Sequence, residues 1–204
     1  MVETLSDAQM TEKKPYHHGD LRHALIEAAK DLVETKGAAH FSVAQAARVA
    51  GVSSGAPYRH FKDRDEMLDA VAKDGLQRLA QRFVVAADPF EEGSVEAITA
   101  IGIAYVDFAK AQPGVFRLMF AELRSESDET CAAGEACKMQ LLRHVGAHLG
   151  HDTIGDATHD AAFPLWTMVH GISFLMIDGK VPAEELDVPL DKMLSDCTRR
   201  LLAR

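Results

Sequence analysis

The 204-residue sequence lacks several common motifs of catalytic and cofactor sites. It has no Walker-type phosphate loop, no Gly-x-Gly-x-x-Gly dinucleotide fingerprint and no His-Glu-x-x-His zinc motif. His144 and His148 have a spacing that can hold a metal on a helix, but no acidic or thiol residue joins them at a recognisable interval. We therefore expect solvated histidines, no metal site, no cofactor and no enzymatic activity.

Cysteine and long apolar segments are also scarce. Cys131, Cys137 and Cys197 stand at unrelated spacings, which supports neither a disulfide framework nor a Cys-x-x-Cys metal site. No uninterrupted apolar run approaches the ~20 residues that span a membrane. The polar N-terminus lacks the apolar core of a signal peptide. These absences predict a cytoplasmic protein without a membrane segment.

Positive charge is in short supply overall, but it is concentrated near the N-terminus. The formal net charge is −9. Between Lys13 and Lys62 there are eight Lys and Arg against four Asp and Glu, whereas from Asp63 onward there are 14 basic and 24 acidic residues. A basic face on an acidic body suits binding of a polyanion at one end of the molecule only.

The most informative stretch runs from Phe41 to Phe61, FSVAQAARVAGVSSGAPYRHF. Ser42 is placed to cap a short apolar helix, and Gly51 is suited to end it in a left-handed conformation. A second short helix over residues 53–60 would begin at a serine cap and hold Pro57 in its first turn, where proline is tolerated. Two short helices joined by a tight turn with Gly predict a helix-turn-helix.

Apolar residues at helical spacing predict helices along the rest of the chain, and no strand pattern occurs. We expect an all-α fold of about nine helices, with an N-terminal three-helix unit followed by a helical bundle. The expected ranges are 20–36, 43–50, 53–60, 64–87, 94–112, 115–123, 128–149, 157–177 and 189–202.

These helices divide the chain into three expected regions. Residues 1–15 have no apolar periodicity and are predicted to be a disordered arm. Residues 16–63 would form a helix-turn-helix DNA-binding domain, and residues 64–204 a ligand-binding and dimerisation domain. Helix 64–87 is long enough to link the two.

The segments YHHGDLRHALIEAAKDLVETKG and FSVAQAARVAGVSSGAPYRHFKDRDEML closely resemble the DNA-binding domain of the tetracycline-repressor (TetR) family over about fifty residues. The matching features are the AxxAGVS turn, YRHF and KxRDEML. The sequence departs from the family at Ser42, where Thr is frequent, and at Pro57, where a larger aliphatic residue is frequent. The resemblance implies a homodimeric regulator, most often a repressor, that binds a palindromic double-stranded DNA operator.

The resemblance also suggests which residues contact DNA. Positions matching Tyr58, His60 and Lys62 commonly contact phosphates in the family. Arg22, in the first turn of its helix, is placed near amides that favour a phosphate, and exposed short side chains can approach bases closely. The full candidate set is Lys14, Arg22, Ser42, Ser53, Ser54, Ala56, Pro57, Tyr58, Arg59, His60 and Lys62.

A second resemblance covers the C-terminal part. Trp166, His170 and Gly171, in PLWTMVHGISFLMIDG, together with QPGVFRLMF, are similar to a TetR regulatory-domain subtype named for its Trp-His-Gly signature. That subtype implies a helical domain that dimerises through its last two helices, here 157–177 and 189–202, and that can enclose a ligand pocket.

The C-terminal part carries many aromatic and methionine side chains. They could all be core, but we expect some to line a pocket for a small apolar or aromatic effector, which Tyr105 and His170 would orient. The candidate lining residues are Ile101, Tyr105, Phe108, Phe116, Met119, Phe120, Leu142, Phe163, Trp166 and His170. Two alternatives stay open: a helical ligand-binding protein or enzyme without DNA binding, and a DNA-binding protein with no effector.

Overall fold

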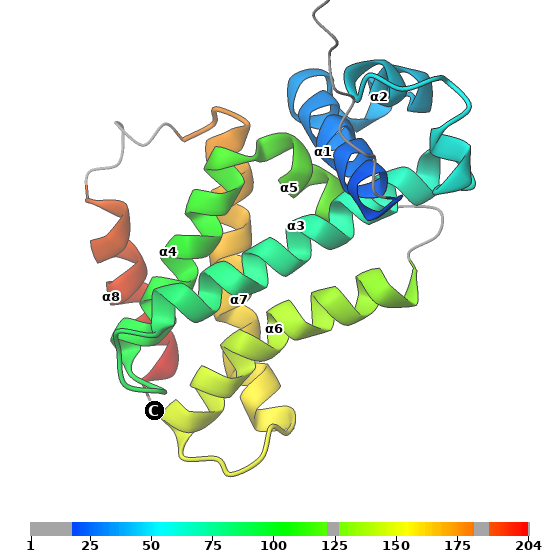
Figure 1. Ribbon diagram of the computed structural model, residues 1–204. Coiled ribbons are helices and arrows are strands. Elements are labelled where there is room, and N and C mark those ends of the chain that lie inside the picture. Colours follow the sequence, from blue (N-terminus) through cyan, green and yellow to red (C-terminus); the bar gives the residue numbers. More distant parts are fainter. Residues whose placement is uncertain (1–17, 122–126, 182–187, 204) are drawn as a thin grey trace, which may run out of the picture.

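The computed structural model describes residues 18–121, 127–181 and 188–203, and every regular element in these ranges is helical (Figure 1). The α-helices are α1 His18–Lys36, α2 Val43–Val49, α3 Arg64–Ala87, α4 Val95–Ala111, α5 Pro113–Met119, α6 Asp128–Leu149, α7 Asp156–Ile177 and α8 Leu190–Leu202. Two short 3₁₀ helices flank α2, η1 Ala38–His40 and η2 Pro57–Arg59. The predicted all-α class is confirmed, and the expected count of about nine helices is close to the eight α-helices of the described ranges.

The second helix of the expected helix-turn-helix is the element that differs. Residues 53–60 form turns around η2 instead of an α-helix. Pro57 has no N–H to donate to the carbonyl of Ser53, so the α-helical bond at this position cannot form. The bonds that do form include three-residue spans, from Ala56 N to Ser53 O at 3.0 Å and from His60 N to Pro57 O at 2.9 Å.

Local capping signals fix the neighbouring helix ends. Ser42 Oγ accepts a hydrogen bond from the backbone N–H of Gln45 at the start of α2. Gly51 follows α2 with φ of 71°, a left-handed conformation in which a side chain would be strained. Asp63 Oδ1 accepts from the N–H of Glu66 at 2.9 Å and caps α3.

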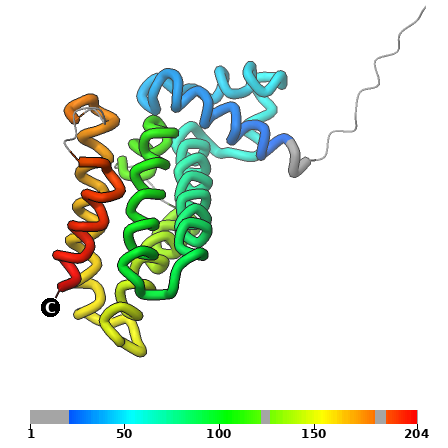
Figure 2. Tube along the Cα trace, turned by 90° about the vertical axis from the view of Figure 1, so that its left-hand side faces the viewer, coloured from blue at the N-terminus to red at the C-terminus, as the bar shows by residue number. Residues whose placement is uncertain are grey.

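The helices are arranged as a small cap lying across one end of a bundle (Figures 1 and 2). The cap consists of α1, α2 and η2, and α3 runs from it into the bundle, where it packs on α4 and α6. In the bundle, α4 also packs on α7 and α8. One continuous cluster of buried apolar side chains extends from α1 to α8. The cap therefore shares its core with the bundle.

Helix α5 begins against the last turns of α1. Glu34 Oε2 accepts a hydrogen bond from Gly114 N at 2.9 Å, and its Oε1 accepts one from Val115 N at 2.8 Å. A Cβ at Gly114 would lie 2.6 Å from the carbonyl oxygen of Val33, so the two backbones can approach this closely only with glycine at this position. The Glu34 carboxylate thus satisfies two amides that the first turn of a helix leaves without partners.

The rest of α5 is held by α3 and α7. The side chains of Val115 and Met119 lie over Gly75 of α3, where a Cβ would come within 2.7 Å and 2.8 Å of their nearest atoms. Arg117 pairs with Asp178 at the end of α7. Helix α5 is therefore in contact with helices of both the cap and the bundle.

Helix α7 is long and apolar enough, by length and composition, to cross a membrane, a property that the search for uninterrupted apolar runs did not predict. A single helix of this kind is weak evidence for a membrane segment. In this fold α7 packs against α4, α6 and α8.

Candidate nucleic-acid interface and internal cavity

Most residues predicted to contact DNA lie on the outer surface of the cap. Ser53, Ser54, Tyr58, Arg59 and Lys62 are all exposed, and Tyr58 has 60% of its surface accessible. These residues lie within ten positions of one another around η2, so hydroxyl groups and two cationic side chains share one segment. Such a segment can reach phosphates with its long side chains and bases with its short ones.

Other members of the predicted set have structural roles. Pro57 is buried, so its ring is not available to DNA, and Ser42 caps α2. The guanidinium of Arg22 is exposed but lies 5.0 Å from the centre of the Phe61 ring, in a cation–π contact. Ala56 and His60 are half-buried. Lys14, like the whole expected arm 1–15, lies outside the described residues.

Two arginines, one in α2 and one at the start of α3, were not among the predicted site residues. Arg48 is exposed in the last turn of α2 and adds a cation near the exposed segment. Arg64 donates from Nε to the carbonyl of Phe41 at 3.1 Å and from Nη2 to that of Ala38 at 2.6 Å, which ties the start of α3 to the chain before α2. The Lys-x-Arg-Asp-Glu-Met-Leu match contained Arg64, but its partners are more than twenty residues away and no local signal identifies them.

Residues 51–55, GVSSG, have the letters of the Gly-x-Ser-x-Gly nucleophile elbow. That motif requires a strand before the serine and a sharp turn into a helix. Here α2 precedes Gly51, and Ser53 lies exposed in a turn. The structural context of a hydrolase elbow is absent from this part of the described chain.

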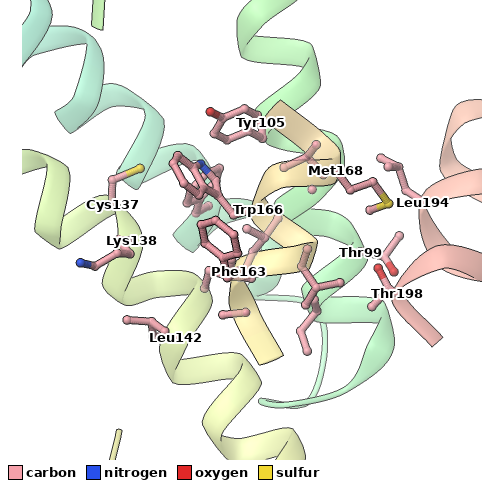
Figure 3. A pocket seen from close by; sticks show the side chains of 18 of the residues that line it. Thr99, Tyr105, Cys137, Lys138, Leu142, Phe163, Trp166, Met168, Leu194 and Thr198 are labelled. Carbon is pink, nitrogen blue, oxygen red and sulfur yellow. The ribbon is translucent and has the colours of Figure 1, made fainter. Parts of the chain in front are cut away.

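The bundle contains a cavity of about 400 Å³, bordered by α3, α4, α6, α7 and α8 (Figure 3). Its walls are almost entirely apolar. Six predicted residues line it: Ile101, Tyr105, Phe120, Leu142, Phe163 and Trp166. Other residues also line the cavity but were not predicted to do so from the sequence, among them Thr99, Cys137, Met168, Leu194 and Thr198.

Four predicted lining residues do not reach the cavity. Phe108 is fully buried and packs under the guanidinium groups of Arg78 and Arg82. Phe116 and Met119 belong to α5 and are buried in the core beside α3. His170 lies behind the wall, in an aromatic cluster with Phe116, Phe120 and Phe174. Helical periodicity identified apolar faces but not which of those faces borders a void.

The polar pair beside the cavity is uncharged. Tyr105 Oη and His170 Nδ1 are 2.7 Å apart. Burial raises the pKa of Tyr105, against a smaller lowering by a hydrogen bond with Trp166, and burial lowers the pKa of His170. The phenol therefore keeps its proton and donates a hydrogen bond to a neutral imidazole.

The cavity also has a thiol and the hydroxyls of Thr99 and Thr198 in its lining, and a cation at its mouth. Burial raises the pKa of Cys137 to about 12, so its thiol stays neutral. Lys138, His159, Phe163 and Trp166 line the cavity and are also exposed, so they form its mouth. The Lys138 ammonium pairs with Glu135 at 2.8 Å.

The expectation of solvated histidines on α6 is wrong. His144 is only 3% exposed and its Nδ1 accepts from Gly93 N at 3.4 Å, while His148 Nδ1 lies 2.8 Å from Gly93 O. Burial lowers the pKa of His144. The two imidazoles brace the turn between α3 and α4. Within the described ranges, no group of three or more His, Cys, Asp or Glu is arranged to hold a metal ion.

Comparison with known proteins agrees with this arrangement. Residues 25–71 match the family model described as bacterial regulatory proteins, tetR family. Residues 98–197 match the model described as tetracyclin repressor-like, C-terminal domain. The Trp-His-Gly subtype is not confirmed by these matches and stays a prediction.

Solved structures give the same result. A protein of unknown function from Rhodococcus sp. RHA1 is 31% identical, with a TM-score of 0.77, covering 93% of this chain and 97% of its own. A TetR-family transcriptional regulator from Streptomyces coelicolor is 19% identical, with a TM-score of 0.66 and coverage of 90% and 98%. The TetR family transcriptional regulator PfmR from Thermus thermophilus is 20% identical, with a TM-score of 0.61 and coverage of 87% and 96%. The last two support the fold alone. On the two family matches, the fold and the likeness at 31% identity together, this chain belongs to the TetR family of transcriptional regulators.

Proposed function

We propose that the protein is a cytoplasmic, ligand-responsive repressor that binds a palindromic operator as a homodimer and leaves it when a small apolar molecule enters the cavity. The observation that carries this proposal is the pairing of an exposed basic segment on the cap with an apolar cavity in the bundle, joined by one continuous core. Residues 16–63 would bind DNA, residues 64–204 would bind the ligand and the second subunit, and α3 would link the two parts.

The proposed DNA contacts divide by side-chain length. Arg59, Lys62 and Arg48 are exposed cations that can pair with phosphates and set the orientation of the cap. Ser53 and Ser54 are short and exposed, so they can approach base edges. Because residues 53–60 are a turn with one 3₁₀ segment, we propose that the Ser53–Ser54 turn, and not the side of an α-helix, meets the bases.

The proposed dimer uses α7 and α8. Leu175 of α7 is 45% exposed and Leu201 of α8 is 42% exposed. Gly171 of α7 is exposed, with no atom within 4 Å of the position of an added Cβ, so a partner helix can approach there. Val169 of α7 and Leu194 of α8 are buried within the protomer and are left out of the proposal.

The proposed coupling runs through α5. Phe120 lines the cavity directly after the end of α5, and its ring lies 5.1 Å from that of Phe116 within α5. At its other end α5 donates two amides to Glu34 of α1. A ligand that displaces Phe120 would therefore shift α5 and, through Glu34, tilt the cap. Helix α3, which carries the cap and also lines the cavity through Leu76 and Phe83, is the second route.

Removal of one cation tests the DNA interface. We expect Lys62→Ala to weaken binding to every duplex and to reduce the slope of log affinity against log salt by about 0.9, the effect of one lost phosphate contact. Lys192→Ala, which removes an exposed cation from α8, is the matched control and should leave binding unchanged. Fluorescence anisotropy across a salt series measures the affinity and the salt slope of both variants. If Lys62→Ala left the slope of log affinity against log salt unchanged, Lys62 would not contact DNA.

A charge placed on α7 tests the dimer. Leu175→Arg should convert the dimer to a monomer, because an arginine facing the same surface of a second copy adds repulsion and removes apolar contact. Val85→Arg, at a 64% exposed position on α3, introduces the same charge away from the proposed interface. Light scattering after size exclusion gives the mass of each. A dimeric Leu175→Arg variant, or a monomeric wild type, would refute this interface.

Loss of the Glu34 carboxylate tests the coupling. A ligand found by thermal-shift screening should lower operator affinity of the wild type by about 5- to 150-fold, the usual range of allosteric coupling. In Glu34→Ala the ratio of operator affinities without and with the ligand should fall towards one. The affinity for the ligand should be retained, since Glu34 does not line the cavity. Glu34→Gln keeps one acceptor oxygen and should be intermediate, and Asp31→Asn, at an exposed position of α1, should behave as wild type. Full ligand-induced release by Glu34→Ala would show that the coupling takes another route.

A further inference from the structure

We propose that Thr99 selects the ligand: the cavity takes an uncharged apolar molecule with one hydroxyl or carbonyl group, which hydrogen-bonds to Thr99 Oγ1. This inference rests on the proposed function, in which the cavity is the effector site. It adds the chemical class of the effector and the residue that discriminates it.

The observation behind this inference is a hydroxyl without a partner. Thr99, in α4, lines the cavity and is only 7% exposed, and its Oγ1 is buried with no hydrogen bond. Among the described residues, Gln45, Arg78 and Gln140 also carry such an atom, but none of them lines the cavity. A buried hydroxyl that has lost its water contacts without gaining a partner is destabilising, and a ligand that supplies the partner recovers that loss.

Helical hydroxyls usually avoid this penalty within their own helix. Ser173 of α7 does so by donating from Oγ to the carbonyl of Val169 at 2.7 Å. Thr99 makes no equivalent bond. Threonine has two accessible χ1 positions in a helix, which exchange the hydroxyl and the methyl group, so Oγ1 can turn towards a group at the cavity wall.

The other polar groups restrict the charge of the ligand. Tyr105 already pairs with His170, and both are neutral. The Cys137 thiol is neutral as well, and the ammonium of Lys138 stands at the exposed mouth in an ion pair with Glu135. An ionised group deep in the cavity would therefore be buried without a counter-charge, which is strongly unfavourable.

The position of Thr99 sets the orientation of the ligand. Figure 3 places Thr99 with Thr198, Met168 and Leu194 on one side of α7, and Cys137 and Lys138 on the other. The polar group of the ligand would lie at the α8 side, and its apolar body would occupy the apolar remainder of the cavity. A threonine hydroxyl both donates and accepts, so a hydroxyl and a carbonyl are both suitable partners.

Three probes with one ring system separate the possibilities. Naphthalene is apolar, 2-naphthol is neutral with a hydroxyl at pH 7, and 2-naphthoate is an anion. Isothermal titration calorimetry of the full chain without DNA should give affinities in the order 2-naphthol, naphthalene, 2-naphthoate. One hydrogen bond to Thr99 predicts that 2-naphthol binds about three- to tenfold more tightly than naphthalene.

Two variants assign that difference to Thr99. Thr99→Val has nearly the same shape without the hydroxyl, so the preference for 2-naphthol should disappear while the affinity for naphthalene is unchanged. Thr99→Ser keeps the hydroxyl and should keep the preference. Because Thr99 makes no hydrogen bond in the free protein, Thr99→Val should not lower the melting temperature, whereas removal of a structural hydroxyl would lower it.

Several results would overturn the inference. Tightest binding of 2-naphthoate would make the ligand an anion held at Lys138. If Thr99→Val lowered the affinities for naphthalene and 2-naphthol equally, Thr99 would affect only the shape of the cavity. If no probe bound, the cavity would not be a site for this ligand class. A failure of the proposed function has a different signature: the probes bind with the predicted order, but no cavity ligand changes DNA affinity.

Discussion

The carboxylate of Glu34 links the cap to the bundle by accepting hydrogen bonds from the amides of Gly114 and Val115. The contact joins residues eighty positions apart in the chain and closes only because Gly114 has no Cβ to meet the Val33 carbonyl. Hydrogen bonds to a charged acceptor are worth more than neutral ones, about 1.5–3 kcal/mol. A bond of that size is comparable to a typical allosteric coupling energy of about 1–3 kcal/mol. The position of the cap on the bundle can therefore depend on how α5 is seated.

Charge and apolar surface are kept apart in this fold, and that separation determines how it can regulate. The exposed cations of the proposed DNA face lie on the cap, whereas the cavity lies inside the bundle and is lined almost entirely by apolar groups. A ligand in the cavity cannot compete with DNA for the same contacts, so its effect has to pass through helix positions. Phe120 at the cavity wall and Glu34 at the cap mark the two ends of the route through α5. The long α3 is the second proposed route, since its residues belong to the core of both the cap and the bundle.

The sequence predicted the elements that depend on local signals. The range 64–87 matches α3 at both ends because Asp63 caps it and the following Asp-Pro segment interrupts the helical pattern. Pro57 was visible in the sequence, but its missing N–H is compatible both with the first turn of an α-helix and with a 3₁₀ turn, and its burial in the cap was not predicted. The partners of Glu34 and Arg64 lie far along the chain, and no periodicity identifies them. Thr99 was missed for a similar reason. Whether its hydroxyl has a hydrogen-bond partner depends on which groups surround it in the folded protein.

In the proposed coupling, a ligand in the cavity shifts α5 and thereby strains the two hydrogen bonds that α5 donates to Glu34 of α1. Hydrogen exchange at the amides of Gly114 and Val115 measures this contact directly, because both donate to Glu34 in the described structure. With no ligand, and with operator bound, both amides should be protected. A cavity ligand that releases the operator should accelerate their exchange by about tenfold, which corresponds to a loss of about 1.4 kcal/mol. Unchanged protection of these two amides in the ligand-bound, operator-released protein would contradict the account.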